Sequence, residues 1–182
     1  MIETNRCLLR LATMEDAQGI IDFYIQNKDH LAPWDPKIPE DFYTLSYWNK
    51  KIEDYKNEFD QNSSLRLLII FQENNKIIGM INFTNFERGP FQNCRLGYKI
   101  GKEYEGKSLM YESLRESISY LFSKYNLHRV EANYIPVNSR SGNVLKRVGF
   151  TENGIAKDYL YINGKWQDHI LTSLINKSWK KR

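Results

Sequence analysis

Two short segments join a turn to the start of a helix, an arrangement that suits the binding of an anion. The first is the strand CRLGYKI followed by GKEYEGKSLMYESL, where a glycine-bearing turn leads from the strand into a helix. Backbone N–H groups in such a turn point at one spot, and the dipole of the helix start adds to their field. Small residues let a phosphate approach the backbone, so the segment predicts a diphosphate site.

The second segment is N-x-x-S, formed by Asn138 and Ser141 before VLKRVGF. Taken alone, it is explained by local structure, because Asn138 suits a helix cap and Ser141 the first turn of that helix. One expected strand separates this turn from the first. Both helix starts therefore fall at the same edge of adjacent strands, and we expect the two segments to share one site.

Common catalytic signatures are missing from the chain. It contains no G-x-S-x-G, no Walker A loop, no H-E-x-x-H and no G-x-G-x-x-G after a strand. The histidines, His30, His128 and His169, are scattered, and Cys7 and Cys94 stand apart from any metal-ligand spacing. We therefore expect structural histidines, reduced thiols and no metal.

Length and composition predict one globular domain over residues 1–182, with 41% hydrophobic and 14% aromatic residues. The longest apolar run, Leu67 to Phe71, is far shorter than the ~20 residues that span a bilayer, so we expect no membrane contact. The opening MIETNRCLLRL lacks the basic and apolar regions of a signal peptide. These features predict a cytoplasmic protein.

The charge balance is mildly basic, with 26 Lys+Arg against 22 Asp+Glu. Because the charges are interspersed and form no basic stripe, we expect no strong nucleic-acid binding. Residues 176–182 (NKSWKKR) concentrate four positive charges. This tail either keeps the terminus in solution or steers the protein toward an anionic partner such as a cofactor phosphate or a ribosome surface.

Hydrophobic periodicity and turn residues predict an α/β fold with a mixed sheet. Thr13 begins T-x-x-D, which resembles a capping box, and three prolines make residues 31–39 an irregular loop. Asn163-Gly164 predicts a hairpin. The expected elements are a strand at 7–11, helices carrying residues 17–25 and 45–59, strands at 65–71, 76–86 and 94–100, a helix at 106–125, a strand at 128–135, a helix at 139–148, and hairpin strands at 158–162 and 166–175.

The chain resembles the GCN5-related N-acetyltransferases (GNAT), and most closely their RimJ/RimL branch, which acetylates N-terminal amines of ribosomal proteins. The most specific stretches are IGKEYEGKSLMYESL and LHRVEANYIPVNSRSGNVLKRVGF. APWDP and GIAKDYLYINGKWQDHILTSL are similar to ribosomal-protein-alanine acetyltransferases in particular. The resemblance implies a central mixed, mostly antiparallel sheet flanked by helices, whose fourth and fifth strands splay apart to admit acetyl-CoA.

The resemblance also implies which residues hold acetyl-CoA. The strand residues Tyr98, Lys99 and Ile100 would pair with the pantetheine arm, and the Asn138 side chain would bond the same region. The pyrophosphate loop corresponds to Glu105, Gly106, Lys107, Ser108, Leu109 and Met110. It departs from the family pattern R/Q-x-x-G-x-G/A at Glu105, Ser108 and Met110. Backbone N–H groups make this site. Lys107 either offsets the Glu105 charge or, as an exposed lysine at a helix start, is only solvated.

In the family's chemistry an amine attacks the thioester directly, and Ser141 would give a proton to the departing thiolate. The amine must be neutral, which at pH 7 costs about 1 kcal/mol for an α-amine and about 4.6 kcal/mol for lysine. An N-terminal amine therefore needs only a water relay or a modest carboxylate as base. Asp158 is our preferred base, because it should border the acceptor cleft; alternatively, it is only a carboxylate at the edge of the hairpin. Asp168 and Glu131 are the other candidates, although Glu131 beside Arg129 fits a structural role.

Substrate contacts are expected from the proline-fixed loop and from the hairpin. Trp34 and Asp35 would form a lip over the incoming peptide, with Asp35 holding its ammonium; alternatively, Trp34 only covers the core. Tyr159 and Tyr161 alternate with Leu160, so one face of the hairpin serves the site, and Tyr159 is its candidate residue.

We therefore expect an acetyl-CoA-dependent N-acetyltransferase that acts on the N-terminal alanine of a small-subunit ribosomal protein. One alternative keeps the chemistry and changes the acceptor to a small amine, such as an aminoglycoside or a polyamine, which a strongly anionic cleft would favour. The other is a non-catalytic ribosome-associated factor. The unusual EGKSLM loop supports that alternative and the intact N-x-x-S opposes it.

Overall fold

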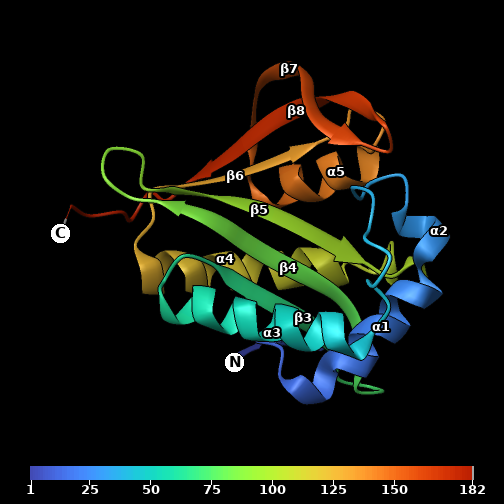
Figure 1. The fold of residues 1–182 in the computed structure, drawn as a ribbon. Helices are drawn as coiled ribbons and strands as arrows, with labels where there is room; N and C mark the ends of the chain where they lie inside the picture. The colour runs from blue at the N-terminus through green and yellow to red at the C-terminus, as the bar shows by residue number, and fades with distance from the viewer. Residues whose placement is uncertain (182) are drawn as a thin grey trace.

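The computed structural model describes residues 1–181, in which an eight-stranded sheet carries helices on both faces (Figure 1). Arg182, the last residue of the basic tail, lies outside the described residues. The strand order is β1-β2-β3-β4-β5-β6-β8-β7, and only the pair β5–β6 is parallel. The elements are β1 (Ile2–Glu3), β2 (Cys7–Arg10), η1 (Met14–Asp16), α1 (Ala17–Gln26), α2 (Lys28–Leu31), α3 (Leu45–Asp60), β3 (Leu65–Phe71), β4 (Lys76–Glu87), β5 (Asn93–Ile100), η2 (Lys102–Tyr104), α4 (Leu109–Tyr125), β6 (Arg129–Tyr134), α5 (Ser139–Val148), β7 (Thr151–Ile162) and β8 (Lys165–Ile175).

The parallel pair β5–β6 is short, and the two strands then separate. They pair only where Asn93, Cys94 and Arg95 face Arg129, Val130 and Glu131. Beyond that point β5 follows β4 to Ile100, whereas β6 follows β8 to Tyr134 (Figure 1). Within residues 1–181, the edge of β5 that faces this gap has no strand partner. Counted from β2, these are the fourth and fifth strands, so the expected splay is confirmed.

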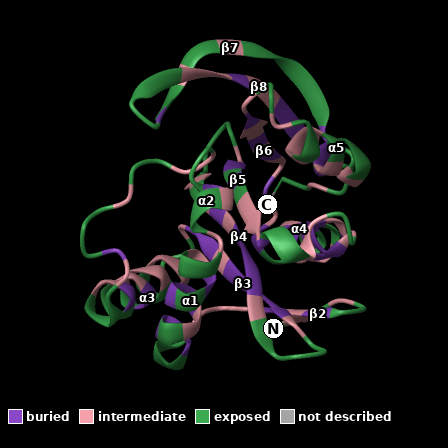
Figure 2. Cartoon of the chain, turned by 90° about the vertical axis from the view of Figure 1, so that its right-hand side faces the viewer, coloured by how far each residue is buried: buried purple, intermediate pink, exposed green. Residues whose placement is uncertain are grey.

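Two apolar layers hold the helices against the sheet, and their residues follow from helical spacing. On one face, α4 buries Leu114, Ile118 and Leu121. On the other face, α1 and α3 bury residues that include Trp48 and Ile52. Figure 2 shows buried segments along the central strands and on the helix sides that face them. The sheet is therefore fixed from both faces, and the gap between β5 and β6 opens inside a rigid frame.

Most expected elements are confirmed, and the differences have local causes. The capping box at Thr13 forms, because its N–H donates to Asp16 Oδ2 at 2.7 Å. Two short elements, β1 and α2, were not expected. The prediction that the first hairpin strand begins at Asp158 is wrong, since β7 begins at Thr151. The first half of this edge strand shows no alternation of apolar and polar residues, because most of its side chains are exposed. It also contains Gly154, whose φ is 138°.

Both cysteines are buried free thiols. Burial raises the pKa of Cys7 to about 11 and that of Cys94 to about 12, so both remain protonated at neutral pH and are poor nucleophiles. In the part of the chain that the structure describes, no helix combines the length and apolarity needed to cross a membrane.

A glycine sets how closely α5 approaches the sheet. A Cβ atom at Gly142 would lie 2.7 Å from both Cζ and Oη of Tyr134 on β6. The Tyr134 ring cannot withdraw easily, because it is 9% exposed and its hydroxyl donates to Glu152 Oε1 at 3.0 Å. Gly142 follows Ser141, so this contact also sets the position of that hydroxyl.

We predict that Gly142→Ala lowers the free energy of unfolding in a urea titration. Overpacking costs about 1–3 kcal/mol, which exceeds the ~1 kcal/mol that alanine gains over glycine in a helix. Gly97→Ala is the matched control, because a Cβ atom there meets open space. Equal stability of the Gly142→Ala protein and the wild type would show that α5 does not depend on this contact.

Candidate active site

A cavity of about 390 Å³ opens where β5 and β6 separate. Its walls come from α2, the loop after α2, β5, the turn before α4, α4 itself and α5 with the residue that caps it. The expected site residues that line it are Trp34, Asp35, Tyr98, Lys99, Ile100, Glu105, Gly106, Ser108, Leu109, Met110, Asn138 and Ser141. A larger cavity of about 670 Å³ lies between α1, α3 and the sheet, but its lining contains none of the expected site residues within the described chain.

The turn before α4 lines the cavity and has the backbone conformation of an anion-binding turn. Gly106 and Ser108 both adopt left-handed backbone conformations, with φ of 72° and 61°, and α4 begins at the next residue, Leu109. Alternating conformations of this kind aim successive N–H groups at one point, where the helix dipole favours an anion. Glycine would adopt this geometry without strain, so Ser108 replaces a glycine at some conformational cost.

The Glu105 carboxylate is neutralised, although not by Lys107. Arg140 at the start of α5 donates to Glu105 Oε2 at 2.5 Å, and His30 Nε2 lies 3.4 Å from Oε1. Lys107 lies outside the described cavity lining, and its ammonium is 5.6 Å from the Tyr104 ring centroid. Of the two roles expected for Lys107, the offset of Glu105 is wrong, because the fold brings Arg140 to the loop, and the exposed Lys107 fits the solvated role.

Two hydroxyl groups meet at the gap between the strands. Asn138 Oδ1 accepts a hydrogen bond from the Ser141 N–H at 3.2 Å, so Asn138 caps α5 as expected. Ser141 Oγ lies 2.8 Å from the Tyr98 hydroxyl, which also lies 3.2 Å from the Ser141 carbonyl. Burial raises the pKa of Tyr98 above its ordinary range, so its phenol stays protonated at neutral pH. Both hydroxyls are able to donate a proton here, and sequence reasoning missed the one on Tyr98.

An ion pair lies on the opposite side of β5. Successive strand residues point to opposite faces, so Lys99 turns away from the Tyr98–Ser141 pair. Its Nζ is 2.5 Å from Asp35 Oδ2 and 4.9 Å from the Tyr24 ring centroid. Burial alone would lower the pKa of Lys99, but Tyr24 and Asp35 outweigh it and the pKa is raised. Asp35 therefore lines the cavity as expected, but with a cation already bound to it.

The carboxylates expected to act as base lie elsewhere. Asp158 is exposed in a bulge of β7, at a φ of 46°, and its N–H donates to Asp168 Oδ1 at 3.1 Å. Asp168 pairs with Lys157 at 2.6 Å, and Glu131 accepts from Arg129 at 2.8 Å. Among residues 1–181, these three carboxylates are outside the cavity lining. The bulge, which the sequence does not signal, moves Asp158 out of register with β8.

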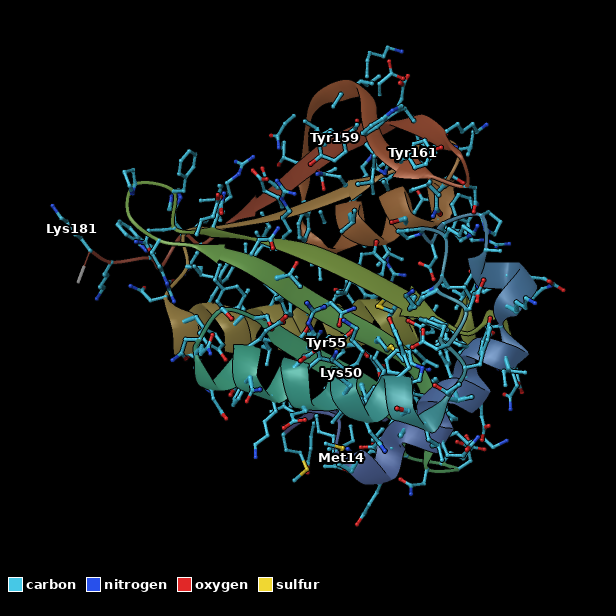
Figure 3. All side chains as sticks on the ribbon, viewed as in Figure 1. Met14, Lys50, Tyr55, Tyr159, Tyr161 and Lys181 are labelled. Carbon is cyan, nitrogen blue, oxygen red and sulfur yellow. The ribbon has the colours of Figure 1, made fainter. Side chains whose placement is uncertain are left out.

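Tyr159 is also outside the described cavity lining. Its hydroxyl accepts from Asn133 Nδ2 at 3.0 Å, and its ring centroid is 5.3 Å from that of His169. Tyr161 is 55% exposed on the same hairpin, and its ring centroid lies 5.6 Å from that of Trp166 (Figure 3). The hairpin reaches the proline-rich loop through Asn163, whose Nδ2 donates to the Ala32 carbonyl at 2.6 Å. The tip of the hairpin, rather than Tyr159, therefore contacts the loop that carries Trp34 and Asp35.

Several lining residues were missed by sequence reasoning, and two of them are cations. Arg140 and Arg147 lie on one face of α5, seven residues apart, a spacing that could have revealed them. Arg147 donates to Ser108 Oγ at 3.3 Å and lies 4.4 Å from the Tyr111 ring centroid. Together with the turn before α4 and the free edge of β5, these cations suit an extended ligand that carries phosphates. Over the described range, residues 1–181, no cluster of three His, Cys, Asp or Glu side chains could hold a metal ion.

Known proteins match this chain over nearly all of its length. A family model described as an acetyltransferase (GNAT) domain matches residues 6–151. The [ribosomal protein uS5]-alanine N-acetyltransferase of Escherichia coli (strain K12) is 41% identical over 179 residues, which cover 98% of this chain and 92% of the relative. A crystal structure of ribosomal-protein-S5-alanine acetyltransferase from Vibrio fischeri matches with a TM-score of 0.94 and 38% identity, covering 98% of each chain. Mycobacterium smegmatis RimJ in complex with CoA-disulfide matches with a TM-score of 0.88 and 26% identity, covering 96% of this chain and 84% of that one.

We predict that Asp35→Asn lowers the free energy of unfolding by about 1–3 kcal/mol, because the mostly buried Lys99 ammonium would lose its carboxylate. Urea titration measures the change. Asp54→Asn is the control, since Asp54 pairs with Lys51 at 3.8 Å on an exposed helix surface, where such pairs contribute at most about 1 kcal/mol. A similar effect of both substitutions would mean that the Lys99–Asp35 pair behaves as a surface pair.

Proposed function

This chain belongs to the GNAT acetyltransferases, and from that membership we propose that it acetylates the N-terminal alanine of a small-subunit ribosomal protein. The family uses acetyl-CoA, which supplies the acetyl group as a thioester. Relatives named for alanine acetylation of ribosomal protein uS5 or S5 match 98% of this chain, which supports the acceptor. Such an acceptor implies a cytoplasmic enzyme.

The residues around the gap fit acetyl-CoA. The free backbone edge of β5 from Tyr98 to Ile100 would bond the pantetheine arm as a neighbouring strand would. The N–H groups at Gly106 and Ser108 would hold the pyrophosphate, and Arg147 adds positive charge beside them. The Asn138 side chain already caps α5, so we assign its contribution to the position of the helix start.

We assign proton donation to the thiolate to the hydroxyl groups of Ser141 and Tyr98. Ser141 Oγ would donate to the departing thiolate, the Tyr98 hydroxyl, 2.8 Å away, would return a proton to Ser141, and the Tyr98 phenolate would regain a proton from water. Proton donation from a positioned group typically contributes ~10²–10⁴-fold to a rate. Because burial keeps Tyr98 protonated, the pair holds its proton through neutral pH.

The observation that carries the choice of acceptor is the pairing of the cavity's carboxylates. The lining contains two carboxylates, Asp35 and Glu105, and both are ion-paired. No carboxylate in this described lining is free to act as a strong base. A lysine acceptor would need about 4.6 kcal/mol to become neutral at pH 7, whereas an α-amine needs about 1 kcal/mol and can lose its proton to water. The site is therefore suited to an N-terminal amine.

Intact mass spectrometry tests this function directly. The protein is incubated with acetyl-CoA and either a peptide with a free N-terminal alanine and no lysine, or an N-terminally blocked peptide with an internal lysine. We predict that only the first peptide gains one acetyl group. Acetylation of the lysine peptide, or of neither peptide, would contradict the proposal.

We predict that Ser141→Ala lowers kcat ~10²-fold or more with a smaller change in KM for acetyl-CoA, because proton donation acts on the transition state. Tyr98→Phe should lower kcat less, and the double variant should match Ser141→Ala, since Tyr98 acts through Ser141. Steady-state kinetics at saturating peptide measure these effects. An unchanged kcat in Ser141→Ala would mean that water protonates the thiolate.

A further inference from the structure

Lys99 is a cation built into the side of the cavity that faces away from the hydroxyl pair. Its side chain is 18% exposed, that of Asp35 is 24% exposed, and both residues line the cavity. The ammonium also lies 4.9 Å from the centroid of the Tyr24 ring. That ring stacks on Trp48 at 5.5 Å and contacts Phe42 edge-on at 4.8 Å. These aromatic rings hold the Lys99 ammonium in place, and Lys99 and Asp35 both line the cavity.

Lys99 lies on the side of β5 that faces Asp35, away from the two proton donors, and we take the side lined by Trp34 and Asp35 as the acceptor side because these residues were expected to form the lip over the peptide. Tyr98 reaches Ser141 on α5, whereas Lys99 reaches Asp35 on the loop that follows α2. Trp34 lines the cavity beside Asp35. An amine that approaches from this loop therefore meets Lys99 and Asp35 before it reaches Ser141.

The charges of the lining are unfavourable for a polyamine. Its two carboxylates, Asp35 and Glu105, face three permanent cations, Lys99, Arg140 and Arg147. His30 is the remaining titratable group with basic character, and it lies against Glu105. A polycationic amine would thus find no unpaired carboxylate in the described lining. Without Lys99, Asp35 would present a half-buried negative charge to the incoming amine.

We propose that Lys99 is a specificity-determining residue that excludes polycationic amines by neutralising Asp35 on the acceptor side of the cavity. The proposal rests on the acetyl transfer proposed above and adds the basis of its acceptor choice. A peptide brings a single ammonium, whereas spermidine brings three positive charges. Electrostatic discrimination grows with the charge of the acceptor, so the ion pair affects spermidine much more than the peptide.

The test measures kcat/KM for spermidine and for the alanine peptide by the release of CoA thiol. It compares the wild type with Lys99→Met, Asp35→Asn and the double variant. Lys99→Met should raise kcat/KM for spermidine at least ~10-fold and raise the ratio of spermidine to peptide turnover. Asp35→Asn leaves the ammonium unpaired and should lower spermidine turnover below wild type. Lys99→Met/Asp35→Asn removes both charges and should return spermidine turnover close to the wild-type value. This order is specific to electrostatics, because loss of packing would reduce turnover in all three variants.

Two further variants serve as controls. Lys99→Arg keeps the charge and should keep the wild-type ratio of kcat/KM for spermidine to kcat/KM for the peptide. Lys102→Met removes an exposed lysine outside the described cavity lining, so kcat/KM for both substrates should stay at the wild-type value. Thermal unfolding shows whether Lys99→Met folds, and Lys99→Gln replaces it if it does not. No gain for spermidine in a folded Lys99 variant, or an equal gain in Asp35→Asn, would overturn the proposal. Wild-type activity on the peptide tests the proposed function separately, so the two failures are distinguishable.

Discussion

The short parallel pairing of β5 with β6 is the constraint on which the rest of the site depends. Three paired positions hold the two strands together, and each strand then follows its antiparallel neighbour. The divergence leaves a backbone edge on β5 without a strand partner in residues 1–181 and makes room for the cavity. Elements on both sides of the gap fix its width, since α4 is packed against one face of the sheet and Gly142 lets α5 lie close to Tyr134.

Charge pairing then decides what the cavity can accept. Arg140 neutralises Glu105 beside the turn that suits phosphates, and Lys99 neutralises Asp35 beside the entrance proposed for the amine. The remaining cation, Arg147, lies near that turn, where an anionic cofactor benefits from it. The same pairing leaves no free carboxylate in the described lining to deprotonate a strongly basic amine. In the proposed function, one half of the site would therefore bind an anion and the other would favour an acceptor of low charge and low pKa.

The sequence predicts the features that depend on neighbouring residues and misses those that depend on distant ones. The cap at Asn138, the hairpin at Asn163-Gly164 and the apolar face of α4 were predicted because each is encoded within a few positions. Lys99 and Asp35 are 64 positions apart, so no local sequence pattern predicts their ion pair. Asp158 was predicted to border the acceptor cleft from its place in the chain. A bulge in β7 places it on an exposed surface instead. The splay itself was expected only through the family resemblance.

In the proposed reaction the acetyl group meets its acceptor amine at the gap between β5 and β6, next to the Ser141 and Tyr98 hydroxyls. The most direct measurement is a crystal structure with a bisubstrate analogue, in which the sulfur of CoA is joined through an acetyl linker to the α-amine of an alanine peptide. We expect the sulfur to lie within hydrogen-bonding reach of Ser141 Oγ and the alanine to lie on the Lys99 side of β5. An analogue bound in the cavity between α1 and α3, or with its sulfur away from Ser141, would contradict it.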